Sequence, residues 1–177
     1  LRGPADPDLA TTLVQLGSSQ LKAGDAQGAM QSYREGLRIY EASGGKDSAG
    51  AMVTRGNLAE AWLDAGDAEA AAKAMAGVRE HHALMFGEGS DRHQAMIMRW
   101  VRIELLRGKH AAALALTDEL IRLANQDDGP VSASELRRQR AVALSRAQAL
   151  AGLDRGDDAW SLAKPVLDAA RAEGWTE

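Results

Sequence analysis

Turn dipeptides recur along this chain at near-regular intervals and separate segments with a helical pattern. Gly24-Asp25, Gly66-Asp67 and Gly156-Asp157 are three of them, and Gly108-Lys109 takes the remaining place in the series. The first two intervals between their glycines are equal (66 − 24 = 42 and 108 − 66 = 42), and the last is longer by six (156 − 108 = 48). A period of about 20 to 50 residues indicates stacked supersecondary units rather than one globular core. The spacing therefore predicts an array of repeated helical pairs.

The composition favours helices in every segment. Of the 177 residues, 45% are hydrophobic and only 4% are aromatic, and Ala and Leu are far more frequent than β-branched residues. Small and unbranched side chains suit close-packed helices better than a pleated sheet. We therefore expect an all-α fold, a right-handed α-solenoid of about four antiparallel helix pairs that forms a single domain over residues 1–177. The expected repeats cover residues 6–45, 47–87, 91–127 and 131–175.

The Asp residues of the series are placed to cap the helices that follow them. A carboxylate at the N-cap accepts hydrogen bonds from the first backbone N–H groups of a helix. We expect Asp25, Asp67 and Asp157 to act in this way, each at the start of the second helix of a pair. Ser132-Ala-Ser-Glu135 fits a capping box at the start of a long first helix that ends near Leu153.

The second helices are predicted from their apolar pattern. The pattern predicts one helix over residues 68–86 and another over residues 110–126. The last, over residues 158–173, contains Pro165, which lacks a backbone donor and clashes with the preceding turn inside a helix. We therefore expect that helix to be kinked or to start late. Trp175, near the end, is expected to cover an otherwise bare apolar face.

Charge, cysteine content and hydropathy argue against several classes of partner. The net charge is −4, with 21 Lys and Arg against 25 Asp and Glu, which is not the basic footprint of a nucleic-acid-binding protein. The chain has no Cys, so it has no thiolate ligand or thiol nucleophile. No apolar run reaches the roughly 18 residues that span a bilayer, and no signal peptide is recognisable. We expect neither a nucleic-acid nor a membrane partner, and a cytoplasmic location.

The sequence contains no recognisable catalytic constellation. It has no Gly-rich phosphate loop, nucleophile elbow or paired carboxylates. His81, His82 and His93 invite a metal interpretation, but two consecutive helical residues point about 100° apart. We therefore expect no metal, no cofactor and no enzymatic activity in this chain.

The residues around the turns resemble a known repeat family. The order of Leu-Gly, a turn Gly, a small Ala and a bulky aromatic residue is similar to that of the tetratricopeptide repeat (TPR). The residues that carry the resemblance are Leu16-Gly17, Gly24-Asp25, Ala29 and Tyr33 in the first repeat, and Leu58-Ala59, Gly66-Asp67 and Ala71 in the second. The third repeat matches less fully, and in the fourth Ser161 stands where the family has the small Ala.

The length of the period resembles one type within this family. The usual TPR period is about 34 residues, and the longer period of this chain is closer to the kinesin-light-chain type. The stretch Gly3-Pro-Ala-Asp-Pro-Asp-Leu-Ala10 is similar to the Gly-Pro-Asp-His-Pro-x-x-Ala motif between repeats of that type. Such arrays also occur within large bacterial proteins, including serine/threonine kinases and signalling regulators. Because Leu1 lies inside a repeat motif, the resemblance implies a fragment of a larger bacterial protein.

The resemblance also implies a function in protein binding. In this family the concave face is lined by the first helix of each pair, and in the kinesin-light-chain type an Asn-Leu-Ala stretch contacts a peptide backbone through its Asn. Asn57-Leu58-Ala59 matches that stretch, and the equivalent positions are Gln15, Arg99 and Ala147. An amide can both donate and accept, and Arg102 beside Arg99 adds charge that can pair with a carboxylate.

Two functions are therefore considered for the chain. The first is a scaffold or regulatory module of a signalling protein that binds a protein or peptide on the concave face, with Gln15, Asn57, Arg99 and Arg102 as candidate contacts. The alternative is an oligomerisation arm of an upstream enzyme, such as a bacterial serine/threonine kinase, in which the chain forms a homo-oligomer through Trp175.

Overall fold

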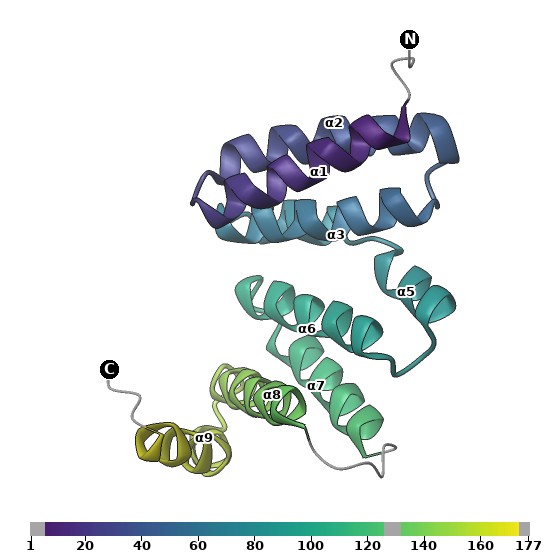
Figure 1. The fold of residues 1–177 in the computed structure, drawn as a ribbon. Coiled ribbons are helices and arrows are strands. Elements are labelled where there is room, and N and C mark those ends of the chain that lie inside the picture. Colours follow the sequence, from purple (N-terminus) through teal and green to yellow (C-terminus); the bar gives the residue numbers. More distant parts are fainter. Residues whose placement is uncertain (1–5, 126–131, 174–177) are drawn as a thin grey trace. The chain divides into compact units, whose positions relative to one another are not determined.

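The computed structural model of the chain describes residues 6–125 and 132–173. These residues form nine α-helices and no strand, so the prediction of an all-α fold is confirmed (Figure 1). The helices are α1 (Pro7–Lys22), α2 (Ala26–Gly44), α3 (Ala49–Asp64), α4 (Ala68–Ala74), α5 (Val78–Phe86), α6 (Asp91–Leu106), α7 (His110–Ala124), α8 (Ala133–Ala151) and α9 (Gly156–Ala172). No helix in the described ranges is both long and apolar enough to cross a membrane. Trp175 and the first residues of the Gly3–Ala10 motif lie outside these ranges.

The chain divides into two compact units, Leu1–Met96 and Ile97–Glu177, which are described separately. In the first unit α1 packs on α2, α2 packs on α3, and α3 packs on α4 and α5. The helices α1 and α3 also contact each other directly. In the second unit α7 packs on α8, and α8 packs on α9. Most of these contacts join helices that follow each other in the chain, as in a stack of helical pairs.

The first helices of the pairs start at a strict interval. The residues that precede them and cap them are Asp6, Ser48, Ser90 and Ser132, which are equally spaced along the chain (48 − 6, 90 − 48 and 132 − 90 are all 42). Each side-chain oxygen accepts a hydrogen bond of 3.0 to 3.3 Å from a backbone N–H of the first turn. The cap by Ser132 was predicted from the sequence, whereas the caps by the other three were not. Glu135 does not complete the expected capping box, because its carboxylate binds Arg138 and Gln139 instead.

The turns inside the pairs share one hydrogen-bond pattern. A residue with positive φ ends the first helix each time: Gly24 (82°), Gly66 (80°), Gly108 (68°) and Asp154 (59°). The N–H group of the following residue binds the carbonyl oxygen five positions earlier, at 2.8 to 3.0 Å. This long-range bond is part of the Schellman motif, which satisfies carbonyl groups at the end of a helix. The four internal turns are therefore one structural element that is repeated.

The last turn lies two residues earlier than the sequence predicts. Asp154, rather than Gly156, has the positive φ, and α9 already begins at Gly156. Asp157 therefore lies in the first turn of α9, and the residue at the N-cap is Arg155, whose side chain makes no capping bond. The predicted cap by Asp157 is wrong, and so is the predicted late start of this helix, which continues through Pro165.

An extension of α8 causes this shift. The interval from the N-cap to the turn residue is the same in the first three repeats (24 − 6, 66 − 48 and 108 − 90 are all 18) and longer by four in the fourth (154 − 132 = 22). Four extra residues add about one helical turn of 3.6 residues, so the apolar face of the helix is nearly preserved. The first two predicted caps are confirmed, since Asp25 and Asp67 each accept a bond of 2.8 Å from the N–H group three positions later.

The single helix predicted over residues 68–86 is wrong, because the chain breaks between α4 and α5. Gly77 has a left-handed conformation, with φ at 74° and ψ at −8°. A right-handed helix cannot pass through this conformation, which Gly adopts without a steric penalty. The N–H group of Val78 binds the carbonyl oxygen of Met75 at 3.0 Å and closes the turn.

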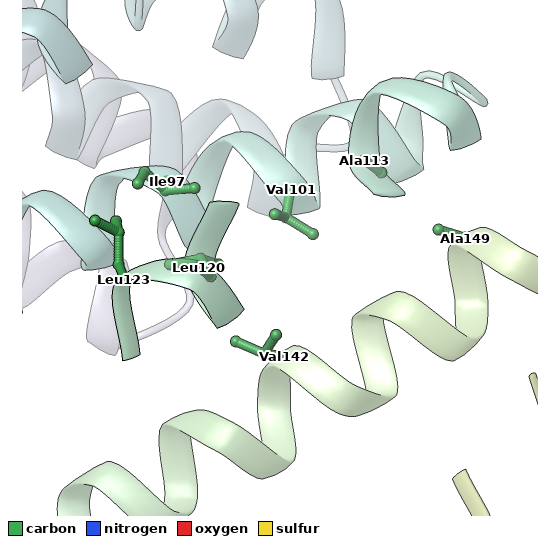
Figure 2. Close-up of a cluster of buried hydrophobic side chains, with 7 residues drawn as sticks. All are labelled: Ile97, Val101, Ala113, Leu120, Leu123, Val142 and Ala149. Carbon is green, nitrogen blue, oxygen red and sulfur yellow. The ribbon is translucent and has the colours of Figure 1, made fainter. Parts of the chain in front are cut away.

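Small residues allow the two helices of each pair to approach closely. They are Ala29, Ala71, Ala113 and Ala159, each buried and each five positions after the turn residue. Ala159 therefore replaces Ser161 as the fourth small residue, because of the shift of the last turn. In the second unit, Ile97 and Val101 of α6 pack with residues of α7 and α8, as Figure 2 shows. The residues from these two helices are Ala113, Leu120, Leu123, Val142 and Ala149.

Tyr33 of α2 fills the space between α1 and α2. Its side chain is fully buried, and its hydroxyl donates to Oγ of Ser18 at 3.1 Å. A Cβ atom at Gly17 would lie 2.8 Å from the ring. The close approach of ring and backbone therefore requires Gly at this position.

Candidate protein-binding surface

Gln15 and Asn57 occupy the same position on neighbouring first helices. Each lies nine residues after the N-cap of its helix, Asp6 for α1 and Ser48 for α3. The two helices are in direct contact, so both side chains belong to the face that the first helices form in this unit. Gln15 is exposed and Asn57 is half-buried.

The side-chain amide of Asn57 makes no hydrogen bond to any other residue in the described part of the chain. Val53, one turn earlier on the same face, is 43% exposed. A half-buried amide offers two donors and an acceptor in a partly dehydrated place. It is therefore suited to pair with the N–H and C=O groups of an extended peptide backbone.

Arg99 and Arg102 lie on α6 in the second unit. They are three positions apart and share one face of the helix. Arg99 is half-buried, Arg102 is exposed, and each has an interaction within the protein. The two arginines belong to one unit, and Gln15 and Asn57 belong to the other.

Ala147 is not the fourth equivalent of Asn57. It is buried, and it lies seven positions before the turn residue Asp154, as Gly17 lies seven positions before Gly24. Counted from the same turn, the equivalent of Asn57 is Ser145. The sequence prediction missed Ser145 because it placed the last turn at Gly156.

Two of the histidines that suggested a metal site, His82 and His93, contact other residues of the protein. Nδ1 of His93 accepts a hydrogen bond of 3.1 Å from the N–H group of Gly89 in the turn before α6. The ring of His82 is buried, with its centroid 5.1 Å from that of Phe86. Within residues 6–125 and 132–173, no three side chains of the metal-binding types lie close enough together to hold an ion.

Three exposed ion pairs shift the pKa of their carboxylates. A hydrogen bond from Arg38 lowers the pKa of Glu35, and one from Lys164 lowers the pKa of Asp168. Arg140 of α8 binds Glu173 with bonds of 2.9 and 2.6 Å, which lowers the pKa of that carboxyl. The last pair joins α8 to the end of α9.

The fold is that of known helical repeat proteins. No family model matches the chain, and no curated protein matches it. The crystal structure of BtubC (BKLC) from P. vanneervenii is similar to it, with a TM-score of 0.79 and 16% identity over 97% of this chain and 68% of that one.

A Podosopora anserina protein assigned as a kinesin light chain, with nearly identical TPR-like repeats, is also similar. Its TM-score is 0.77, with 17% identity over 100% of this chain and 81% of that one. The structure of a point variant of this protein has a TM-score of 0.79, with 16% identity over 99% of this chain and 81% of that one. At such identities the likeness shows the fold alone. The chain therefore has a TPR-like helical repeat fold of the solenoid class, which confirms the fold resemblance predicted from the sequence.

Proposed function

We propose that the chain is a protein-interaction module whose first helices bind extended segments of a partner, α1 and α3 in the first unit and α6 in the second. The observation that carries this proposal is the half-buried amide of Asn57, which has no hydrogen-bond partner among the described residues and occupies the position equivalent to Gln15 on a contacting first helix. Stacked helical repeats present extended surfaces of this kind to protein partners.

The candidate residues of each unit favour a partner chemistry of their own. In the first unit, Asn57 and Gln15 pair with backbone amides, which do not depend on the partner's side chains. In the second unit, Arg99 and Arg102 favour a segment that carries acidic side chains or a terminal carboxylate. The module then acts as a scaffold or regulatory part of a signalling protein, and its role is binding rather than catalysis.

A peptide-binding experiment tests this function. The full chain is screened against an immobilised library of extended peptides, and the affinity of selected peptides is measured by fluorescence anisotropy. The double variant Asn57→Ala, Arg102→Glu is expected to bind at least about tenfold more weakly, which corresponds to about 1.4 kcal/mol.

The matched control is the double variant Gln31→Ala, Lys46→Glu, which makes similar changes at exposed positions outside the first helices. It is expected to bind like the wild type. An unchanged affinity of the Asn57 and Arg102 variant, or an equal loss in the control, would contradict the proposed surface.

A further inference from the structure

Two helices expose apolar positions whose counterparts in the contact between α2 and α3 are buried. Leu16 of α1 is 50% exposed, whereas Leu58 of α3 is 7% exposed. Both lie ten residues after the N-cap of a first helix. Trp160 of α9 is 59% exposed, whereas Met30 of α2 is 1% exposed, and both lie six residues after the turn residue.

The counterparts of Trp160 in the first and third repeats pack on the first helix of the following pair. Met30 of α2 lies in one cluster with Leu58 and Ala61 of α3. Leu114 of α7, the third-repeat equivalent of Trp160, is half-buried and packs against Ala147 and Leu150 of α8, which are not the equivalents of Leu58 and Ala61. In both units, therefore, the residue six positions after the turn contacts the next first helix. In the contact between α2 and α3, Trp160 of α9 is equivalent to Met30 and Leu16 of α1 is equivalent to Leu58.

We propose that α9 of one copy of this chain packs on α1 of a second copy, in the register of the internal contact between α2 and α3. This surface is separate from the face of Gln15 and Asn57. In that register Trp160 takes the place of Met30 and packs on Leu16, and Ser19 takes the place of Ala61. A small residue thus again faces the large side chain of the second helix.

Charges at the ends of the two helices agree with this register. Tyr40 of α2 lies against Gly50 of α3, where an added Cβ atom would be 2.5 Å from the ring. The equivalent residues are Ala170 of α9 and Asp8 of α1. Arg171, whose side chain is 70% exposed, then lies beside Asp8 in the acidic first turn of α1. The proposed contact therefore pairs opposite charges, Arg171 and Asp8, near the apolar pair Trp160 and Leu16.

The contact is heterologous because it joins two different surfaces. Each added copy covers one face and brings another, so the assembly is not limited to a dimer. Its size depends on concentration until the array closes or the protein is exhausted.

Sedimentation velocity of the full chain over a concentration series tests this proposal. The wild type is expected to form species larger than a dimer. Leu16→Glu and Trp160→Glu are each expected to lower the association constant more than about tenfold. The matched control is Leu84→Glu on α5, which changes an 86% exposed Leu away from both faces and is expected to associate like the wild type. Far-UV circular dichroism checks that all variants keep the helical fold.

A mixture of the two variants decides whether the contact joins different surfaces. Leu16→Glu keeps an intact α9 face and Trp160→Glu keeps an intact α1 face, so an equimolar mixture is expected to form a 1:1 dimer and nothing larger. A wild type that stays monomeric would overturn the proposal, as would a mixture without dimers. Association that survives both changes would assign self-contact to another surface and would also overturn it.

Discussion

The internal turns of the first and fourth repeats have the same geometry but different residues. In the first, Gly24 has the positive φ and Asp25 caps α2 through its carboxylate. In the fourth, Asp154 has φ at 59° and Arg155 makes no capping bond. The Gly-Asp dipeptide is therefore not required for this turn. The packing of α9 on α8, through Ala159 and its neighbours, holds the fourth turn in place. In the first repeat, the Gly-Asp dipeptide lowers the free energy of the folded turn.

The largest change in stability is expected from a substitution in the core of the first repeat, where the fourth repeat has a smaller side chain. Tyr33 fills the core of the first repeat, and Ala163 occupies the same position in the fourth. Tyr33→Ala is expected to lower the free energy of unfolding by about 3 to 5 kcal/mol, because it leaves a cavity. Tyr33→Phe keeps the ring and loses only the bond to Ser18, which costs about 1 kcal/mol. Urea unfolding of both variants measures the difference, and equal losses would show that the ring does not fill the core.

The next largest change in stability is expected from substitutions of the turn residues. Gly24→Ala is expected to destabilise the protein by about 1 to 2 kcal/mol, because a side chain with positive φ is strained. Beyond the two neighbouring residues of the chain, no atom lies within 4 Å of the added Cβ, so the loss is conformational. Asp154→Gly is expected to stabilise by up to about 1 kcal/mol for the same reason. Chemical denaturation measures both changes, and changes of the same sign would contradict this view of the turns.

Substitutions of the capping residues are expected to change the stability by a smaller amount. Asp25→Ala is expected to cost about 1 kcal/mol, because the N–H group of Gly28 loses its acceptor. Lys109→Asp supplies the cap that the third repeat lacks and is expected to add a similar amount. Asp157→Ala is the control, since this residue lies inside α9 and loses only its interaction with the helix dipole, about 0.3 kcal/mol. Thermal unfolding compares the three, and a loss for Asp157→Ala as large as that for Asp25→Ala would contradict the assignment.

The smallest effect depends on pH. The pair Arg140–Glu173 joins the helices of the fourth repeat, whereas a hydrogen bond of 2.8 Å between Tyr40 and Thr11 joins those of the first. Because the pair lowers the pKa of Glu173, its stabilisation is present above the ordinary pKa of a glutamate and is lost as the pH falls through the lowered value. The difference in melting temperature between Glu173→Gln and the wild type is therefore expected at neutral pH and to vanish in acid. Tyr40→Phe is the control, and its effect should not change over the same range.

Local signals allowed much of the fold to be predicted from the sequence. The helix pairs, the turns at Gly24, Gly66 and Gly108, and the caps by Asp25 and Asp67 follow from residue types within a few positions. These features have a direct chemical cause in a single turn, namely the freedom of Gly and the hydrogen bonds of a carboxylate.

The predicted turn at Gly156 and the predicted single helix over residues 68–86 were wrong because they depend on more than the residues of one turn. The extra turn of α8 preserves the apolar face, so the sequence pattern predicts the turn at Gly156 instead of Asp154. The left-handed Gly77 interrupts a pattern that is otherwise helical. For the candidate surface, the sequence predicted Asn57 by resemblance. That its amide has no hydrogen-bond partner within the described ranges is a property of the folded chain.

The most direct test is a measurement of backbone φ angles in solution, from NMR chemical shifts and scalar couplings of the full chain. If packing sets the fourth turn, positive φ is expected at Gly24, Gly66, Gly108 and Asp154, with Gly156 helical at the start of α9. A positive φ at Gly156, with Asp154 helical and Asp157 at the N-cap, would show that the Gly-Asp dipeptide sets the turn, and would contradict this explanation of the repeats.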